Sequence, residues 1–156
     1  MRKRIMASFA VLVAAAVLLA SCGGEDKEEI KIDKDAVLKA GTYTGQSSES
    51  KEEDGGGYAI VKLTVGDDHE IEKVDFKTYD KNGNPKSSEN YGMVNGKVED
   101  QERYDSARAA VKACEEYAEQ YMVTKDLEEV DAISGATISY EQFKEALSIA
   151  LQKAAE

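Results

Sequence analysis

Residues 59–79 read Ala-Ile-Val-Lys-Leu-Thr-Val, then Gly-Asp-Asp-His-Glu, then Ile-Glu-Lys-Val-Asp-Phe-Lys-Thr-Tyr. Apolar side chains alternate with others in the first seven residues, and alternation of this kind places one set on a single face of a strand. That inward set comprises Ala59, Val61, Leu63 and Val65. The polar, glycine-led stretch at 66–70 is typical of a turn, and residues 71–79 return as a second strand. The sequence therefore predicts a β-hairpin.

The second strand of this hairpin has Val74 and Phe76 on its inward face. Ile71 is out of phase with them, so we expect a bulge or a late strand start at this point. Upstream, residues 42–44 lie between Gly41 and Gly45 and predict a short first strand.

Two helices are predicted after the strands. Residues 106–122 carry apolar and small side chains at spacings of three and four, and Asp105 or Ser106 is a natural N-cap. The inner stripe of this helix comprises Ala107, Ala110, Val111, Cys114, Ala118 and Tyr121. The second helix is predicted to begin at Ser139 with a capping box. Its inner face comprises Phe143, Leu147, Ala150, Leu151 and Ala154. We expect an α+β fold, in which two C-terminal helices pack on an antiparallel sheet with a central hairpin.

The N-terminal residues have the layout of an export signal. A basic start at 2–4 precedes an apolar run at 9–20, which is too short for a confident membrane span. Leu19-Ala20-Ser21-Cys22 resembles the lipobox of bacterial lipoproteins, in which the cysteine is acylated and becomes the new N-terminus. This resemblance implies a signal peptide at 1–21, lipidation of Cys22, an acidic tether at 22–39 and a domain at 40–156. The mature protein would then lie on the extracytoplasmic face of the cell membrane. An ordinary signal peptide with a chance cysteine is the alternative.

The net negative charge of the chain limits the kinds of macromolecule that it can bind. The chain has 20 basic and 31 acidic residues, and removal of the signal leaves 17 basic residues and a net charge of −14. A domain this acidic is poorly suited to nucleic acid, because phosphates repel it.

Side chains that often carry catalysis are scarce. With Cys22 lipidated, Cys114 is the one other cysteine, and its apolar helical position favours a packing role. His69 is the single histidine and lies among carboxylates in the hairpin turn, which favours a solvated turn over a metal site. One such histidine supports no convincing hydrolase triad. Residues 80–84 begin like a calcium loop, but Pro85 and Tyr91 break the pattern, so a polar turn is expected. No catalytic residue and no metal ligand is assigned.

The long polar stretch at 80–102 contains Asn82-Gly83 and Asn95-Gly96, both of which favour turns. Loops of this length are usually functional or mobile. Two interpretations stay open, a cover for a ligand pocket and plain surface.

Residues 131–137 read Asp-Ala-Ile-Ser-Gly-Ala-Thr, so that a threonine hydroxyl lies just ahead of the second predicted helix. A helix N-terminus attracts phosphate through its free N–H groups and its dipole. By spacing alone, phosphate binding and a plain tight turn are equally compatible with this loop. Tyr58 follows the glycines at 55–57 and is a candidate for stacking on a flat ligand, or else a half-buried strand-edge tyrosine.

The same seven residues resemble the flavinylation motif of FMN-binding domains, in which Asp, two variable residues and Ser/Thr-Gly-Ala-Thr are read by a flavin transferase. Such domains occur in the flavin-carrying C subunit of sodium-pumping NADH:quinone reductase, in Rnf-type complexes and in lipoproteins of extracellular electron transfer. The resemblance implies FMN as cofactor, joined by a phosphoester to Thr137. Asp131 would serve recognition or orient the loop, and Ser134, Gly135 and Ala136 would shape it. Residues 41–45 and 57–58 resemble the family's domain opening and its glycine-aromatic entry to the sheet, whereas Ser139 stands where many members have threonine.

The resemblance implies a membrane-anchored flavoprotein that relays electrons rather than a substrate-converting enzyme. Its implied partners are the flavin transferase, membrane redox proteins or quinone-linked complexes, and the lipid bilayer through Cys22; nucleic acid is excluded. Alternatives stay open: a non-redox surface lipoprotein, or a non-covalent ligand-binding module in which the Thr137 loop is only structural. A secreted enzyme that uses FMN on its own substrate is a third, for which no substrate-handling residues stand out.

Overall fold

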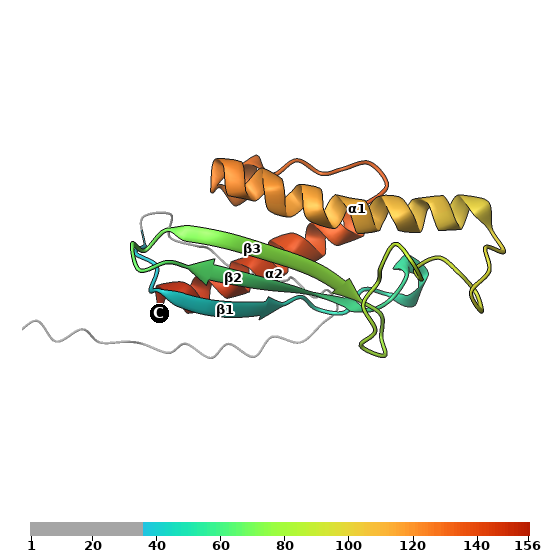
Figure 1. Cartoon of the computed structure of the whole chain (residues 1–156), viewed down its shortest axis with the longest axis horizontal. Helices are drawn as coiled ribbons and strands as arrows, with labels where there is room; N and C mark the ends of the chain where they lie inside the picture. The colour runs from blue at the N-terminus through green and yellow to red at the C-terminus, as the bar shows by residue number, and fades with distance from the viewer. Residues whose placement is uncertain (1–35) are drawn as a thin grey trace, which may run out of the picture.

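The computed structural model describes residues 36–156, so the predicted signal peptide, Cys22 and most of the predicted tether lie outside the described residues. Within this range the chain forms three strands, two α-helices and two short 3-10 turns (Figure 1). The elements are β1 (Gly41–Gln46), η1 (Glu52–Asp54), β2 (Tyr58–Val65), β3 (Ile71–Tyr79), α1 (Gln101–Thr124), η2 (Leu127–Glu129) and α2 (Thr137–Ala155). The predicted α+β fold is confirmed.

The sheet is antiparallel with the order β1-β2-β3, so the hairpin strand β2 is central. Thr64 pairs with Lys73 but Val65 pairs with Ile71, which places a register shift at this point. The irregularity expected from the phase of Ile71 is therefore confirmed as a bulge. All six inward side chains predicted for the hairpin are buried.

Both helices cover the same face of the sheet. α2 packs across β1 and β2, and α1 packs against β3 (Figure 1). The predicted inner face of α2 is buried throughout. Phe143 lies at the centre of an aromatic cluster, with ring centroids 5.0 Å from Phe76, 5.9 Å from Tyr117 and 6.5 Å from Tyr121.

The predicted start of α1 was wrong. The helix begins at Gln101 and not near Ser106, and the Asp100 carboxylate caps it by accepting the Arg103 N–H at 3.0 Å. Its first residues are polar and exposed, so no apolar period marks them.

The predicted start of α2 was also wrong, because the helix begins at Thr137. Ser139 does not cap it but lies buried inside the first turn. Thr137 is therefore the first helical residue and does not precede the helix.

β1 and α2 approach each other closely at Gly45. A Cβ at this position would overlap the carbonyl oxygen of Ala146 and lie 2.8 Å from the nitrogen of Ala150. The absence of a side chain at Gly45 therefore lets the helix pack directly on the strand.

Candidate functional site

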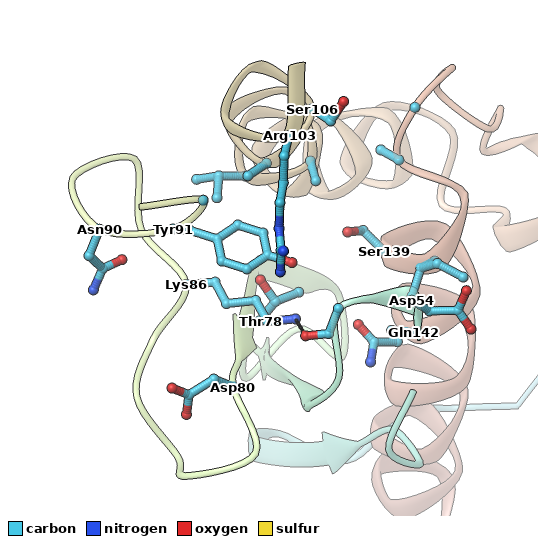
Figure 2. Close-up of a pocket in the computed structure, with 18 of the residues that line it drawn as sticks. Asp54, Thr78, Asp80, Lys86, Asn90, Tyr91, Arg103, Ser106, Ser139 and Gln142 are labelled. Carbon is cyan, nitrogen blue, oxygen red and sulfur yellow. Dashed lines mark hydrogen bonds between the residues drawn. The ribbon is translucent and has the colours of Figure 1, made fainter. Parts of the chain in front are cut away.

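A pocket of about 1250 Å³ lies beside the end of the sheet where β2 begins and β3 ends. Four segments form its walls: η1, the loop after β3, the first turns of α1 and the N-terminus of α2 (Figure 2). Ala110 and Val111, which were predicted to lie in the inner stripe of α1, are half-buried and line this pocket.

The N-terminus of α2 borders the pocket without a side-chain cap. The N-cap residue is Ala136, and no acidic side chain lies in the first turn. Within residues 36–156, the backbone N–H groups of Thr137, Ile138 and Ser139 have no hydrogen-bond partner. Helix ends normally satisfy such groups with a side chain, water or a ligand. The exposed Thr137 hydroxyl therefore lies next to three free donors.

The loop that leads to Thr137 is held by α1. The hydroxyl of Tyr117 accepts the Ile133 N–H at 3.0 Å and donates to the Ala136 carbonyl at 3.1 Å. One turn further along α1, the side-chain oxygen of Gln120 accepts the Asp131 N–H at 2.7 Å. Burial raises the pKa of Tyr117, so its hydroxyl stays protonated and able to donate.

Sequence reasoning missed Tyr117 and Gln120 as site residues. Tyr117 follows Cys114 by three positions and precedes Tyr121 by four, so the helical period did place it on the inner side. Nothing in the sequence showed that its hydroxyl would meet the loop.

The structure brings some of the predicted site residues to the pocket and leaves others away from it. Gly135, Ala136 and Thr137 line the pocket. Gly135 has a φ of +81°, which favours glycine at this turn. Ser134 and Asp131 are exposed on the same loop but do not line the pocket.

Tyr58 is not brought to the pocket. Its strand neighbour Ala59 points into the core, so the ring of Tyr58 lies on the opposite face of the sheet. There it stacks on Tyr79, with ring centroids 5.4 Å apart. Tyr58 is therefore a half-buried strand tyrosine away from this pocket, and its stacking on a ligand stays a prediction.

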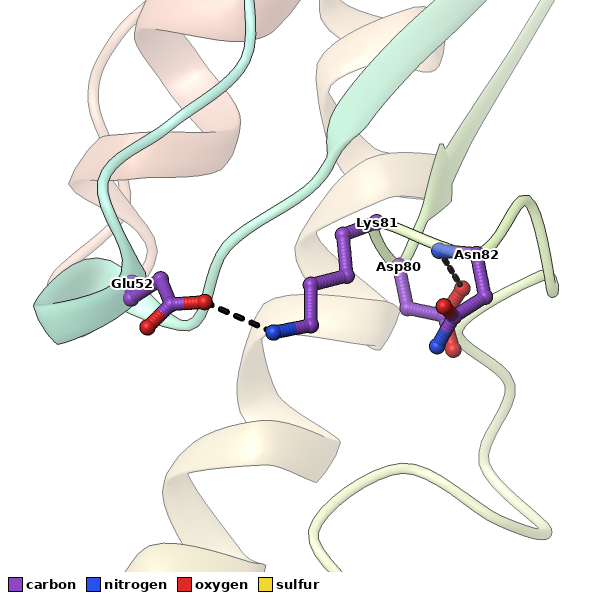
Figure 3. A network of polar contacts seen from close by, with 4 residues as sticks. All are labelled: Glu52, Asp80, Lys81 and Asn82. Carbon is purple, nitrogen blue, oxygen red and sulfur yellow. Dashed lines mark hydrogen bonds and ion pairs between the residues drawn. The ribbon is translucent and has the colours of Figure 1, made fainter.

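The loop after β3 begins with the expected polar turn. The carboxylate of Asp80 accepts the backbone N–H groups of Asn82 and Asn84, each at 2.8 Å, and the Asn84 side chain at 2.9 Å. These bonds, first that from the Asn84 side chain, lower the pKa of Asp80. Lys81 then joins Glu52 at 2.6 Å, which ties the loop to η1 (Figure 3).

Further along, the same loop becomes a wall of the pocket. The Lys86 ammonium donates to the Gly56 carbonyl at 2.6 Å and lies 4.9 Å from the centroid of the Tyr91 ring. On the other side, Arg108 of α1 donates to the Ser88 carbonyl at 2.7 Å. The loop is therefore held at η1 and at α1, and of the two interpretations left open, the pocket wall is the one observed.

Buried polar groups line the inner part of the pocket. Thr78, Ser139 and Gln142 are buried, and the Gln142 amide donates to the Gly57 carbonyl at 3.1 Å. Cys114 lies close by, buried, and its thiol donates to the Ala110 carbonyl at 3.3 Å. Burial raises the pKa of this thiol to about 11, so it is protonated at neutral pH, which fits the predicted packing role.

Two further properties concern residues 36–156. They contain no group of three or more His, Cys, Asp or Glu side chains placed to hold a metal ion. None of their helices is long and apolar enough to cross a membrane.

A pocket bordered by an uncapped helix N-terminus is suited to a ligand with an anionic group. A family model described as FMN-binding domain matches residues 23–152, so the chain belongs to the FMN-binding domain family. No curated protein and no solved structure matches the chain. FMN fits the residues present, because its phosphate suits the three free N–H groups of α2 and its ring system suits the adjoining pocket.

Proposed function

We propose that this protein is a membrane-anchored, extracytoplasmic flavoprotein that carries FMN as a phosphoester on Thr137 and relays electrons. The observation that carries the proposal is the position of Thr137: its exposed hydroxyl lies at the uncapped start of α2, on the rim of the pocket. Membership of the FMN-binding domain family and the motif at 131–137 support it.

Attachment needs an activated flavin and a flavin transferase. The Thr137 oxygen forms a bond to the FMN phosphorus, and the hydroxyl proton is released. A flavin phosphoanhydride such as FAD is a suitable donor, because its anhydride bond breaks and AMP leaves with the electron pair. The protein then carries FMN less one water, and no group changes its oxidation state.

FMN, once bound, supplies a ring that accepts and releases one or two electrons. The residues of this chain provide its surroundings. The free N–H groups at the start of α2 would hold the phosphate, and Tyr117 bonds the loop that presents Thr137. Electron transfer requires no catalytic acid or base, so none is assigned.

Anchoring through Cys22 completes the proposal. The lipobox at 19–22 and the basic, apolar leader before it support lipidation and export. The acidic tether would hold the domain away from anionic head groups. Covalent attachment suits an exported protein, which cannot recover a lost cofactor from the cytoplasm.

The decisive experiment is the intact mass of the mature domain, co-produced with a flavin transferase. We expect a mass increase of FMN less one water in the wild type and none in Thr137→Val, which keeps the side-chain shape and removes the hydroxyl. Thr44→Ala is the matched control, because Thr44 is equally exposed but lies on β1. An unmodified wild type, or an adduct that persists in Thr137→Val, contradicts the proposal.

Anchoring and electron relay have separate tests. Cys22→Ala should move the protein from the membrane fraction to the soluble extracytoplasmic fraction. Reduction of the attached flavin by membranes that contain a quinone-linked donor should be visible as loss of flavin absorbance. Flavin that stays oxidised with every membrane donor favours the alternative of a non-redox binding module.

A further inference from the structure

We propose that Arg103 contacts the ring system of the flavin and raises both its affinity and its reduction potential. The proposal rests on the proposed function, namely that this pocket holds FMN. It assigns to Arg103 a role that neither the motif nor the family match contains.

Arg103 lies in the first turn of α1, where Asp100 caps its backbone N–H. Its side chain extends from the helix into the space between Tyr91 and Ser139 (Figure 2). Within residues 36–156 the guanidinium has no hydrogen-bond or ion-pair partner. An arginine in this state offers a full positive charge and five N–H donors to a ligand.

The other charged groups around the pocket are mostly engaged. The Lys86 ammonium donates to the Gly56 carbonyl and lies over the Tyr91 ring. Glu52 is paired with Lys81, and the Asp80 carboxylate accepts hydrogen bonds within its own turn. Arg103 is therefore the cation of the described pocket that is available to a ligand.

One carboxylate of the pocket is also without a partner in the described part of the chain. Asp54 of η1 lines the pocket, and Figure 2 shows it on the side of Gln142, away from Arg103. A ligand between these two walls would meet charges of opposite sign. Asp54→Asn is therefore a useful variant, because its expected effect on the reduction potential is opposite to that of Arg103→Gln.

The position of the phosphate directs the ring toward Arg103. With the phosphate at the start of α2, a ring placed between α2 and the wall formed by α1 and Tyr91 would meet Arg103. Carbonyl oxygens on a flavin ring accept hydrogen bonds, and a guanidinium is a planar donor that suits them. Reduction adds negative charge to the ring, and a nearby cation favours that charge.

The first test uses unmodified protein, so that it does not depend on flavinylation. Binding of FMN and of riboflavin is measured by quenching of flavin fluorescence. Loss of a charged hydrogen bond should weaken binding to Arg103→Gln roughly tenfold for both ligands. Lys112→Gln is the matched control, because Lys112 is a cation on the same helix that pairs with Glu116 and does not line the pocket.

Riboflavin has no phosphate, so it identifies the part of the ligand that Arg103 contacts. An equal loss for riboflavin and FMN supports a ring contact. A loss confined to FMN would assign Arg103 to the phosphate and overturn the proposal. Unchanged binding in Arg103→Gln, or an equal loss in Lys112→Gln, would overturn it as well.

The second test is the midpoint potential of protein loaded at Thr137. Arg103→Gln should lower the potential, Arg103→Lys should recover part of it, and Asp54→Asn should raise it. A midpoint potential that is the same in the wild type and in all three variants contradicts the proposal. Wild-type protein that binds neither ligand and is never loaded refutes the proposed function itself, whereas normal loading with unaffected Arg103 variants refutes this inference alone.

Discussion

Tyr117 connects the core of the molecule to the loop that presents Thr137. Its ring packs against Phe143 in the core, while its hydroxyl bonds two backbone groups of the loop, one before and one after Gly135. Tyr117 therefore joins the motif to the core, beside the bond from the Asp131 N–H to Gln120. Gly135 supplies the turn between these two bonds with its positive φ.

We predict that Tyr117→Phe keeps the core but loosens the loop. The change leaves the Ile133 N–H and the Ala136 carbonyl without their partner, which should cost about 1–3 kcal/mol of unfolding free energy. Flavin attachment at Thr137 should also slow. Urea denaturation measures the first effect, and a time course of intact mass in the presence of a flavin transferase measures the second.

Tyr140→Phe is the control for this prediction. Tyr140 also packs beside Tyr117, but its hydroxyl makes no hydrogen bond within the described residues. Attachment at the wild-type rate in Tyr117→Phe would show that the loop is positioned by other contacts.

At the scale of elements, the contact of β1 with α2 decides how the last helix lies on the sheet. Gly45 permits this contact because its missing side chain leaves room for the backbone at Ala146 and Ala150. Lys153 adds a bond from α2 to the Thr44 carbonyl at 2.7 Å. The N-terminus of α2 carries Thr137, so the packing of this helix also orients the site.

We predict that Gly45→Ala destabilises the domain strongly, by about 3 kcal/mol, because the new Cβ must push α2 away from β1. Gly96→Ala is the matched control: the space around Gly96 is open, and its φ of +73° makes alanine unfavourable by about 1 kcal/mol. Urea denaturation of both variants measures the difference. A smaller loss in Gly45→Ala than in Gly96→Ala would mean that the strand and helix separate easily.

At the scale of the whole molecule, burial fixes the ionisation of the core. Burial raises the pKa of Cys114 to about 11 and that of Tyr121 to about 12. Both groups are neutral in the folded protein over the physiological range. A group with a raised pKa contributes stability that is complete below its ordinary pKa and is lost as pH rises through the raised value.

We predict that the unfolding free energy is independent of these groups below pH 9 and falls above it. The ordinary pKa of the Cys114 thiol is 9.0, so its contribution should fall by about 2 kcal/mol up to pH 11. Urea denaturation at a series of pH values measures the loss. Cys114→Ala should show a shallower decline between pH 9 and 11, and an identical decline in the variant would refute the assignment.

The sequence predicts those parts of the architecture in which buried side chains recur at a regular spacing. The alternation at 59–65 and the spacing of Phe143, Leu147 and Leu151 reflect burial directly, so the hairpin and the inner face of α2 were predicted correctly. The first turn of α1, residues 101–104, has no aliphatic side chain and gave no such pattern. These residues bring Arg103 to the pocket wall, a position that depends on tertiary structure.

The candidate site, like the fold, was predictable only where a local sequence pattern marked it. A local motif marked residues 131–137, and Gly135 to Thr137 do line the pocket. The opposite wall, with Lys86 and Tyr91, comes from a loop distant in sequence and has no motif of its own. Tyr58 was proposed for its place after three glycines, although the same alternation that buries Ala59 directs its ring to the other face.

The direct contact of β1 with α2 has a consequence for the order of assembly. The earliest strand of the described domain meets its latest helix, so the rim around Thr137 exists only after both ends of the fold have closed on each other. A chain still emerging from a ribosome or a secretion channel has no such rim. A modifying enzyme that reads the assembled rim must therefore act on the finished domain.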